Sequence, residues 1–132
     1  MTEPGTWSED HEVHLTMGLV SAYVGAVGED STVLCEGMAA PPMMAAVYAA
    51  PAIWGTVIEA VEGKGPLIHL AQEFEWFAPV CIGEYVYTRA RLSEVDALGA
   101  HSSLRFRSVS CNGEGRVVSQ GSWTILKPEA SL

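Results

Sequence analysis

The chain has 132 residues, 48% of them hydrophobic, and a formal net charge of −9 at pH 7. These values are typical of one folded domain, so we expect a single domain over residues 1–132, with a loose lead-in at 1–8 and a loose tail at 127–132. The acidic balance counts against nucleic acid as a partner, because phosphate binding requires clustered Lys and Arg. No unbroken apolar run is long enough to span a bilayer, and the acidic N-terminus does not resemble a secretory signal. We therefore expect a cytoplasmic protein with no membrane partner.

Three cysteines, Cys35, Cys81 and Cys111, are spaced without a CxxC pair. Their odd number and spacing argue against both a disulfide framework and a zinc site. We expect singly buried free thiols, no metal and no cofactor.

Four arginines fall in two short runs, at Arg89, Arg91, Arg105 and Arg107. One interpretation is a local basic patch on an acidic protein, which would suit a phosphate-bearing ligand. The other, which we favour, is a set of ordinary solvated strand residues.

The first elements in chain order are short. Residues 12–16 alternate polar and apolar side chains, which predicts a short strand. The apolar residues that follow recur at spacings of three and four, which predicts one face of a helix that Gly28 ends; they are Leu19, Val20, Tyr23, Val24 and Val27.

The segment 38–61 predicts the central helix. Pro41 and Pro42 suit the first turn of a helix, where backbone donors have no partner. Apolar residues and alanines then cover nearly its whole circumference, so we expect the rest of the protein to wrap it. Pro51 should kink the helix or split it in two, and the glycines at 63 and 65 should end it.

After Pro66 the pattern has a period of two, which indicates strands. The first should place Ile68, Leu70, Phe74 and Trp76 on one face and His69 on the other. Further strands are expected over 84–95, 102–111 and 116–126, and the Asn-Gly pair at 112–113 predicts a hairpin between the last two. One apolar helix followed by an antiparallel meander favours an α+β hot-dog fold, in which a curved sheet wraps a long central helix.

Three stretches of the sequence carry a resemblance to a known family: AVGEDSTVLCEGMAAPPMM, LIHLAQEFEWFAPVCIGEYVYTRARL and GEGRVVSQGSWTIL. Together they resemble the MaoC-like dehydratase and hydratase family of hot-dog proteins. The similarity is greatest to the N-terminal half of its two-domain members and to stand-alone subunits built like that half. The resemblance implies an acyl thioester of coenzyme A or acyl carrier protein as substrate, and a homo- or hetero-oligomer with another hot-dog subunit.

The same resemblance identifies the catalytic loop. Family members hydrate a 2-enoyl thioester, or dehydrate its 3-hydroxyacyl product, with an Asp and a His that share one water. Matched onto this chain, Gly28 takes the place of the loop Gly, Glu29 that of the acid and Leu34 that of the His. Because a Leu side chain cannot carry a proton, the resemblance implies a subunit without the dyad that shapes the acyl-chain tunnel beside a catalytic partner.

Candidate site residues follow from this comparison. Glu29 and His69 remain weak catalytic candidates. The alternative for Glu29 is a solvated or capping role. His69 shares its predicted strand face with Glu73, which would allow an imidazole–carboxylate pair, and its alternative is a simply hydrogen-bonded side chain. The candidate substrate-binding residues, for which core packing is the alternative, are Gly37, Met43, Met44, Tyr48, Trp54 and Trp76. Three functions stay open: a non-catalytic subunit of a hydratase or dehydratase, a self-sufficient enzyme that uses Glu29 or His69, and a module that binds acyl thioesters or small apolar molecules.

Overall fold

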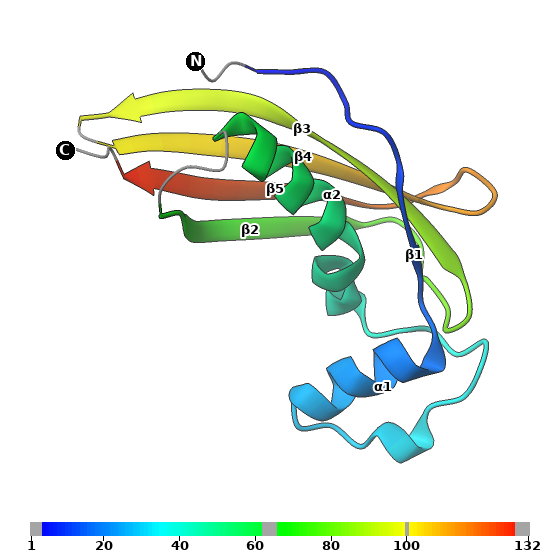
Figure 1. Ribbon diagram of the computed structural model, residues 1–132. Helices are drawn as coiled ribbons and strands as arrows, with labels where there is room; N and C mark the ends of the chain where they lie inside the picture. Colours follow the sequence, from blue (N-terminus) through cyan, green and yellow to red (C-terminus); the bar gives the residue numbers. More distant parts are fainter. Residues whose placement is uncertain (1–3, 62–65, 100, 129–132) are drawn as a thin grey trace.

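A long helix lies across one face of a five-stranded antiparallel sheet (Figure 1). The computed structural model describes residues 4–61, 66–99 and 101–128, so the glycines expected to end the central helix lie outside the described residues. The strand order is β1-β3-β4-β5-β2, which confirms the α+β hot-dog fold. The elements are β1 His11–His14, α1 Met17–Ala26, η1 Ser31–Val33, η2 Pro42–Met44, α2 Ala45–Ala60, β2 Ile68–Trp76, β3 Tyr85–Leu98, β4 His101–Asn112 and β5 Val117–Pro128.

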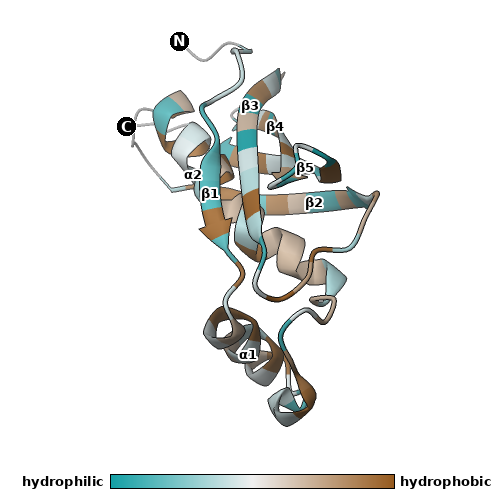
Figure 2. Cartoon of the chain, turned by 90° about the vertical axis from the view of Figure 1, so that its right-hand side faces the viewer, coloured by the Kyte–Doolittle hydropathy of each residue, from teal (hydrophilic) through white to brown (hydrophobic). Residues whose placement is uncertain are grey.

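The strands β3, β4 and β5 form the centre of the sheet and alternate between buried and solvated side chains. Hydrophilic and hydrophobic bands therefore alternate along β3 (Figure 2). The hairpin between β4 and β5 is confirmed, and Asn112 closes it because its side-chain oxygen accepts hydrogen bonds from the backbone N–H groups of Glu114 and Arg116, each at 3.0 Å. β5 runs through Pro128, so Lys127 and Pro128 belong to the sheet and not to a loose tail.

The sheet covers one side of helix α2, as predicted, but the rest of the protein does not cover the helix over its whole circumference, so that part of the expectation is wrong. The side chains that face the sheet are buried, whereas those at Pro51, Gly55, Ile58 and Glu59 form an exposed stripe, with Ile58 59% exposed. One small sheet covers only one face of a helix. The sequence predicts a kink or a split at Pro51. The helix runs through Pro51 as one element, so the split does not occur, and the proline lies on the solvated side.

By length and composition alone, one stretch among the described residues, Pro42–Ala60, could cross a membrane. In this fold the stretch is the central helix, which packs against β3 and β4 and contributes six buried residues to the core. Its apolar character is that of a core helix.

Strand β2 forms one edge of the sheet, and its side chains face differently from the prediction. A β-bulge between His69 and Ala71 shifts the register against β5. His69 consequently lies opposite the buried Ile125, on the same face as Phe74, which lies opposite Gly121. Ile68 and Leu70 do not join that inner face: they are 47% and 59% exposed.

The lead-in is held along β3 and is not loose in the described range. The N–H of Ser8 donates to the carbonyl of Ala90 at 2.8 Å, and the Ala90 N–H donates to the Ser8 hydroxyl at 3.0 Å. The Trp7 ring lies 5.4 Å from the guanidinium of Arg89 and 5.3 Å from that of Arg91. These cation–π contacts secure the segment to the outer face of the sheet.

The four arginines do not act as one group. Arg105 makes a 3.2 Å ion pair with Glu94 on the neighbouring strand, whereas two others contact Trp7. The three cysteines are free thiols, but the expected burial is wrong for Cys35, which is exposed; Cys81 and Cys111 are half-buried.

Candidate functional site

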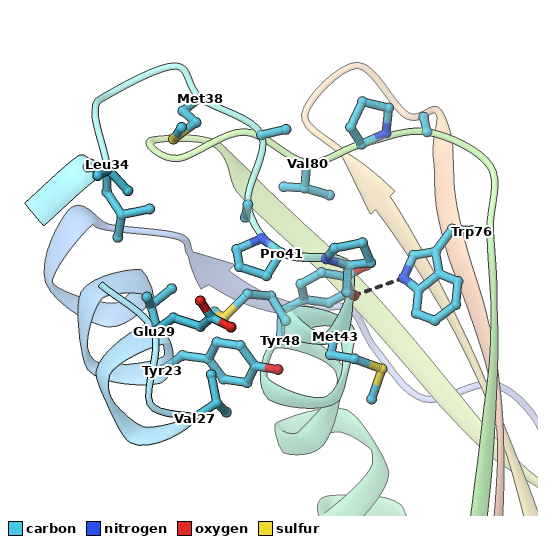
Figure 3. Close-up of a pocket in the computed structure, with 18 of the residues that line it drawn as sticks. Tyr23, Val27, Glu29, Leu34, Met38, Pro41, Met43, Tyr48, Trp76 and Val80 are labelled. Atoms are coloured by element: carbon cyan, nitrogen blue, oxygen red, sulfur yellow. Dashed lines mark hydrogen bonds between the residues drawn. The ribbon is translucent and has the colours of Figure 1, made fainter. Parts of the chain in front are cut away.

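An apolar cleft of about 950 Å³ lies where α1, the loop after it, the start of α2 and the segment after β2 meet (Figure 3). Helix α1 contributes Tyr23 and Val24, the following loop contributes Glu29, and the segment after β2 contributes Phe77 and Val80. The cleft has the size and composition expected of a small-molecule site. Its full lining is Tyr23, Val24, Val27, Glu29, Asp30, Val33, Leu34, Met38, Ala39, Ala40, Pro41, Pro42, Met43, Met44, Tyr48, Trp76, Phe77, Ala78, Pro79 and Val80.

Backbone hydrogen bonds hold one wall of the cleft in place. The N–H of Ala40 donates to the carbonyl of Val80 at 2.7 Å, and the N–H of Ile82 donates to the carbonyl of Met38 at 2.8 Å. Gly37 lies at the end of this ladder with φ of 81°, a conformation that favours glycine. Its N–H donates to the carbonyl of Ile82 at 3.0 Å, and Gly37 does not line the cleft. The structure therefore gives Gly37 a turn role and leaves its N–H engaged.

The two neighbouring carboxylates have different environments. Asp30 caps η1: its carboxylate accepts hydrogen bonds from the Thr32 hydroxyl at 2.6 Å and the Thr32 N–H at 2.9 Å, and these bonds lower the pKa of Asp30 from its ordinary value of 3.8. Glu29 instead points its carboxylate into the cleft (Figure 3). One acid is thus engaged by the loop itself, and the other faces any bound molecule.

Leu34 follows η1 directly, and its side chain is half-buried in the cleft wall. The position that the resemblance assigns to the catalytic base therefore faces the cleft and holds a hydrocarbon side chain. Glu29 lines the same cleft (Figure 3). At the two positions that the resemblance assigns to the acid and the base, the cleft therefore has the carboxylate of Glu29 and the hydrocarbon side chain of Leu34.

Four of the six expected substrate-binding residues line the cleft: Met43, Met44, Tyr48 and Trp76. The Trp76 indole N–H donates to the carbonyl of Pro42 at 2.9 Å, which ties the end of β2 to the start of the central helix (Figure 3). Met43 is 42% exposed and Met44 is buried, so the adaptable methionine side chains reach from the surface to the floor.

Tyr48 is buried, and its hydroxyl lies 2.7 Å from that of Ser119 on β5. Burial raises the pKa of Tyr48, so the side chain is a neutral phenol at physiological pH. Two further buried hydroxyls, those of Thr88 and Ser110, lie 2.7 Å apart in the same row of the sheet. Serines and threonines at inward positions of the expected strands were a usable signal for this polar row, which the sequence prediction did not include.

His69 and Trp54 lie together but do not line the cleft. The His69 ring stacks on Trp123 with centroids 5.5 Å apart, and the Trp54 ring lies nearly perpendicular to it with centroids 5.7 Å apart. No ion pair joins His69 to Glu73 among the described residues. The bulge in β2 turns the imidazole toward these two rings, so its surroundings are aromatic.

The cleft also includes residues that sequence reasoning assigned only to a helix face or to a loop. Tyr23, Val24 and Val27 belong to the apolar face predicted for the first helix, which packs against the cleft and not simply against a core. In the described parts of the chain, no group of three or more His, Cys, Asp or Glu side chains could hold a metal ion. The chemistry that the cleft offers is burial of an apolar group beside a carboxylate.

Residues 3–120 match the family model of the FAS1-like dehydratase domain region. The chain belongs to this family. The match confirms the resemblance to MaoC-like dehydratases and hydratases that the sequence motifs indicated. A sequence search of curated proteins gives no match.

Solved structures of MaoC-like and related proteins share the fold. The HadBC (3R)-hydroxyacyl-ACP dehydratase complex of Mycobacterium tuberculosis superimposes with a TM-score of 0.74 at 15% identity, over 92% of this chain and 95% of that one. The ChsH1-ChsH2 complex of the same organism superimposes with a TM-score of 0.74 at 18% identity, over 95% of this chain and 90% of that one. The (R)-hydratase of A. caviae involved in PHA biosynthesis superimposes with a TM-score of 0.64 at 18% identity, over 96% of this chain and 97% of that one. At these identities the likeness establishes the MaoC-like hot-dog fold.

Proposed function

We propose that this member of the MaoC-like family is the non-catalytic subunit of an enoyl-thioester hydratase or 3-hydroxyacyl-thioester dehydratase. In this role it binds the acyl chain while a partner hot-dog subunit supplies the Asp and His. The observation that carries the proposal is Leu34, which lines the cleft at the position of the family's base. Hydration requires a group that activates water and returns a proton, and a leucine side chain does neither.

Two surfaces support a partner subunit. Strand β2 ends the sheet and exposes apolar side chains along a free edge, including Leu70 at 59% and Trp76 at 43%. Helix α2 exposes Ile58 at 59%. Unpaired apolar edges are a liability in an isolated chain, and a second hot-dog subunit would cover them. Two of the similar structures, HadBC and ChsH1-ChsH2, are complexes by name.

The test is a reconstitution. The purified chain is assayed for hydration of a 2-enoyl coenzyme A, first alone and then co-purified with a hot-dog subunit that carries Asp and His in this loop. We expect turnover only in the mixture, and loss of that turnover when the partner's loop His is changed to Ala. Turnover by the chain alone above background contradicts the proposal.

A self-sufficient enzyme is the second candidate, because the Glu29 carboxylate points into the cleft (Figure 3). On this hypothesis the chain alone has hydratase or dehydratase activity that Glu29→Gln abolishes. A matched surface variant, Glu59→Gln on the exposed side of α2, removes the same charge away from the cleft and should leave that activity unchanged. Binding of acyl chains without turnover under any condition instead favours the third function, a binding module.

A further inference from the structure

Three arginines on the outer face of the sheet have no carboxylate partner among the described residues. Arg89 and Arg91 alternate along β3 with the buried residues that pack on α2, so their side chains lie on the opposite face of the sheet. Arg107 on β4 is the direct register partner of Arg91, and like charges directly opposite each other across two strands repel. The neighbouring Arg105 is different, because it forms an ion pair with Glu94.

The Trp7 ring holds two of these guanidinium groups and shields them from water. Its centroid lies 5.4 Å from the guanidinium of Arg89 and 5.3 Å from that of Arg91. The Arg91 side chain is half-buried, and its Nε–H is buried without a hydrogen-bond partner in the described chain. A guanidinium that has lost part of its hydration attracts an anion more strongly, because their interaction is less screened.

The carboxylates on the same face of the sheet do not neutralise these arginines. On β1, the Glu12 carboxylate accepts a hydrogen bond from the Tyr87 hydroxyl, which raises the pKa of Tyr87 above its ordinary value. On β2, Glu73 and Glu75 border a shallow hollow of about 380 Å³ with Arg107, but strand β5 separates them from it and no ion pair joins them in the described chain. The basic group is therefore a small island with acids around it.

The acidic surroundings limit the size of the anion that fits. Glu9 and Asp10 lie exposed in the lead-in, and Glu94 and Asp96 lie exposed further along β3. An extended acidic protein surface would meet these carboxylates beyond the arginines, on a chain with a net charge of −9. A small anion contacts the guanidinium groups alone, and charges farther away than roughly 10 Å are largely screened at 0.1 M salt.

We propose that Arg89, Arg91 and Arg107, with Trp7 beside them, form a binding site for a small phosphate-bearing anion. Guanidinium groups donate paired hydrogen bonds to phosphate oxygens, and a bound anion relieves the repulsion between β3 and β4. None of the four residues lines the apolar cleft, so the site is separate from it. The inference is independent of the proposed function, and the outcome of the reconstitution does not bear on it.

The test measures binding of inorganic pyrophosphate to the chain alone by isothermal titration in about 0.1 M NaCl. We expect a dissociation constant below about 1 mM and a shift of the Trp7 indole N–H signal, assigned with Trp7→Phe. Inorganic phosphate should bind more weakly, because it carries less charge. Adenosine should not bind. ADP then identifies the source of the phosphate: affinity at least equal to that of pyrophosphate indicates a nucleotide, and lower affinity indicates a free polyphosphate.

Arg107→Gln is the decisive variant, because Arg107 is exposed and does not contact Trp7, so the lead-in stays in place. It should weaken pyrophosphate binding by about threefold to tenfold. Arg107→Lys, which keeps the charge without the fork, should recover part of that loss. Arg116→Gln is the matched control: it removes an exposed charge from the turn before β5 and should change the affinity by less than about twofold.

Four results overturn the inference. They are no binding of pyrophosphate at about 5 mM, equal weakening by Arg107→Gln and Arg116→Gln, an unshifted Trp7 signal on binding, and binding of adenosine as tight as that of ADP. Tighter binding of a deca-glutamate peptide than of pyrophosphate also overturns it, and indicates an acidic protein as the partner of this face.

Discussion

Gly121 on β5 is the position where one added methyl group has the largest expected effect on stability. It is buried on the face that carries α2, opposite Phe74 on one neighbouring strand and Ser108 on the other. A Cβ there would lie 2.6 Å from the Ser108 hydroxyl, 2.7 Å from the Trp123 indole nitrogen and 2.9 Å from a ring carbon of Phe74. All three distances are well inside the roughly 3.5–4.0 Å of an optimal non-bonded contact.

The size of the destabilisation by Gly121→Ala follows from the buried side chains that an added methyl group would displace. Trp123 is 2% exposed, and its indole N–H donates to the Ser108 hydroxyl at 3.2 Å, so neither group can move without losing that bond. Overpacking costs about 1–3 kcal/mol, and a buried hydrogen bond contributes about 1 kcal/mol. Gly121→Ala should therefore lower the free energy of unfolding by about 2–4 kcal/mol and the Tm by roughly 6–15 °C.

Chemical denaturation with urea, followed by tryptophan fluorescence and far-UV circular dichroism, measures the change. Gly25→Ala is the matched control, because Gly25 lies exposed in α1 with nothing within 4 Å of its Cβ position. That substitution should stabilise the protein by about 0.5–1 kcal/mol, since alanine favours a helix. If the free energy of unfolding of Gly121→Ala lies within about 0.5 kcal/mol of the wild-type value, the packing argument for this part of the sheet is wrong.

Two other predictions concern the hydroxyl pair below the cleft and the lead-in. Tyr48→Phe and Ser119→Ala should each lower the free energy of unfolding by about 1–2 kcal/mol, because each change leaves one buried hydroxyl unpaired. The double variant should lose about 1 kcal/mol less than the sum of the two single losses. Strictly additive losses in urea denaturation would refute the coupling. Trp7→Ala should remove about 1–2 kcal/mol of cation–π interaction with Arg89 and Arg91, and should speed hydrogen exchange at the Ser8 amide, whereas Trp7→Phe should retain part of the protection. Unchanged exchange at Ser8 in Trp7→Ala would show that the backbone hydrogen bonds alone hold the segment.

Local periodicity predicted the strands and the two α-helices of this protein, but not the short η1 and η2 turns. The alternation along β3, the Asn-Gly turn before β5 and the apolar segment that becomes α2 each depend on neighbours a few residues away, so the sequence alone indicates them. The motif around Glu29 and Leu34 likewise identified the loop that forms one wall of the cleft, because its residues are contiguous.

Features that depend on distant segments required the tertiary structure. The bulge that turns His69 toward Trp54 and Trp123 arises from pairing with β5, which no pattern within β2 reveals. The sequence predicted Met43 and Trp76 in the site but also Trp54 and Gly37, which do not line the cleft. Helical spacing does not say which face of α2 meets the loop after α1, and Gly37 lies in a loop, where its N–H donates to the carbonyl of the distant Ile82. Local spacing determines which side chains share a face, and only long-range packing decides what that face meets.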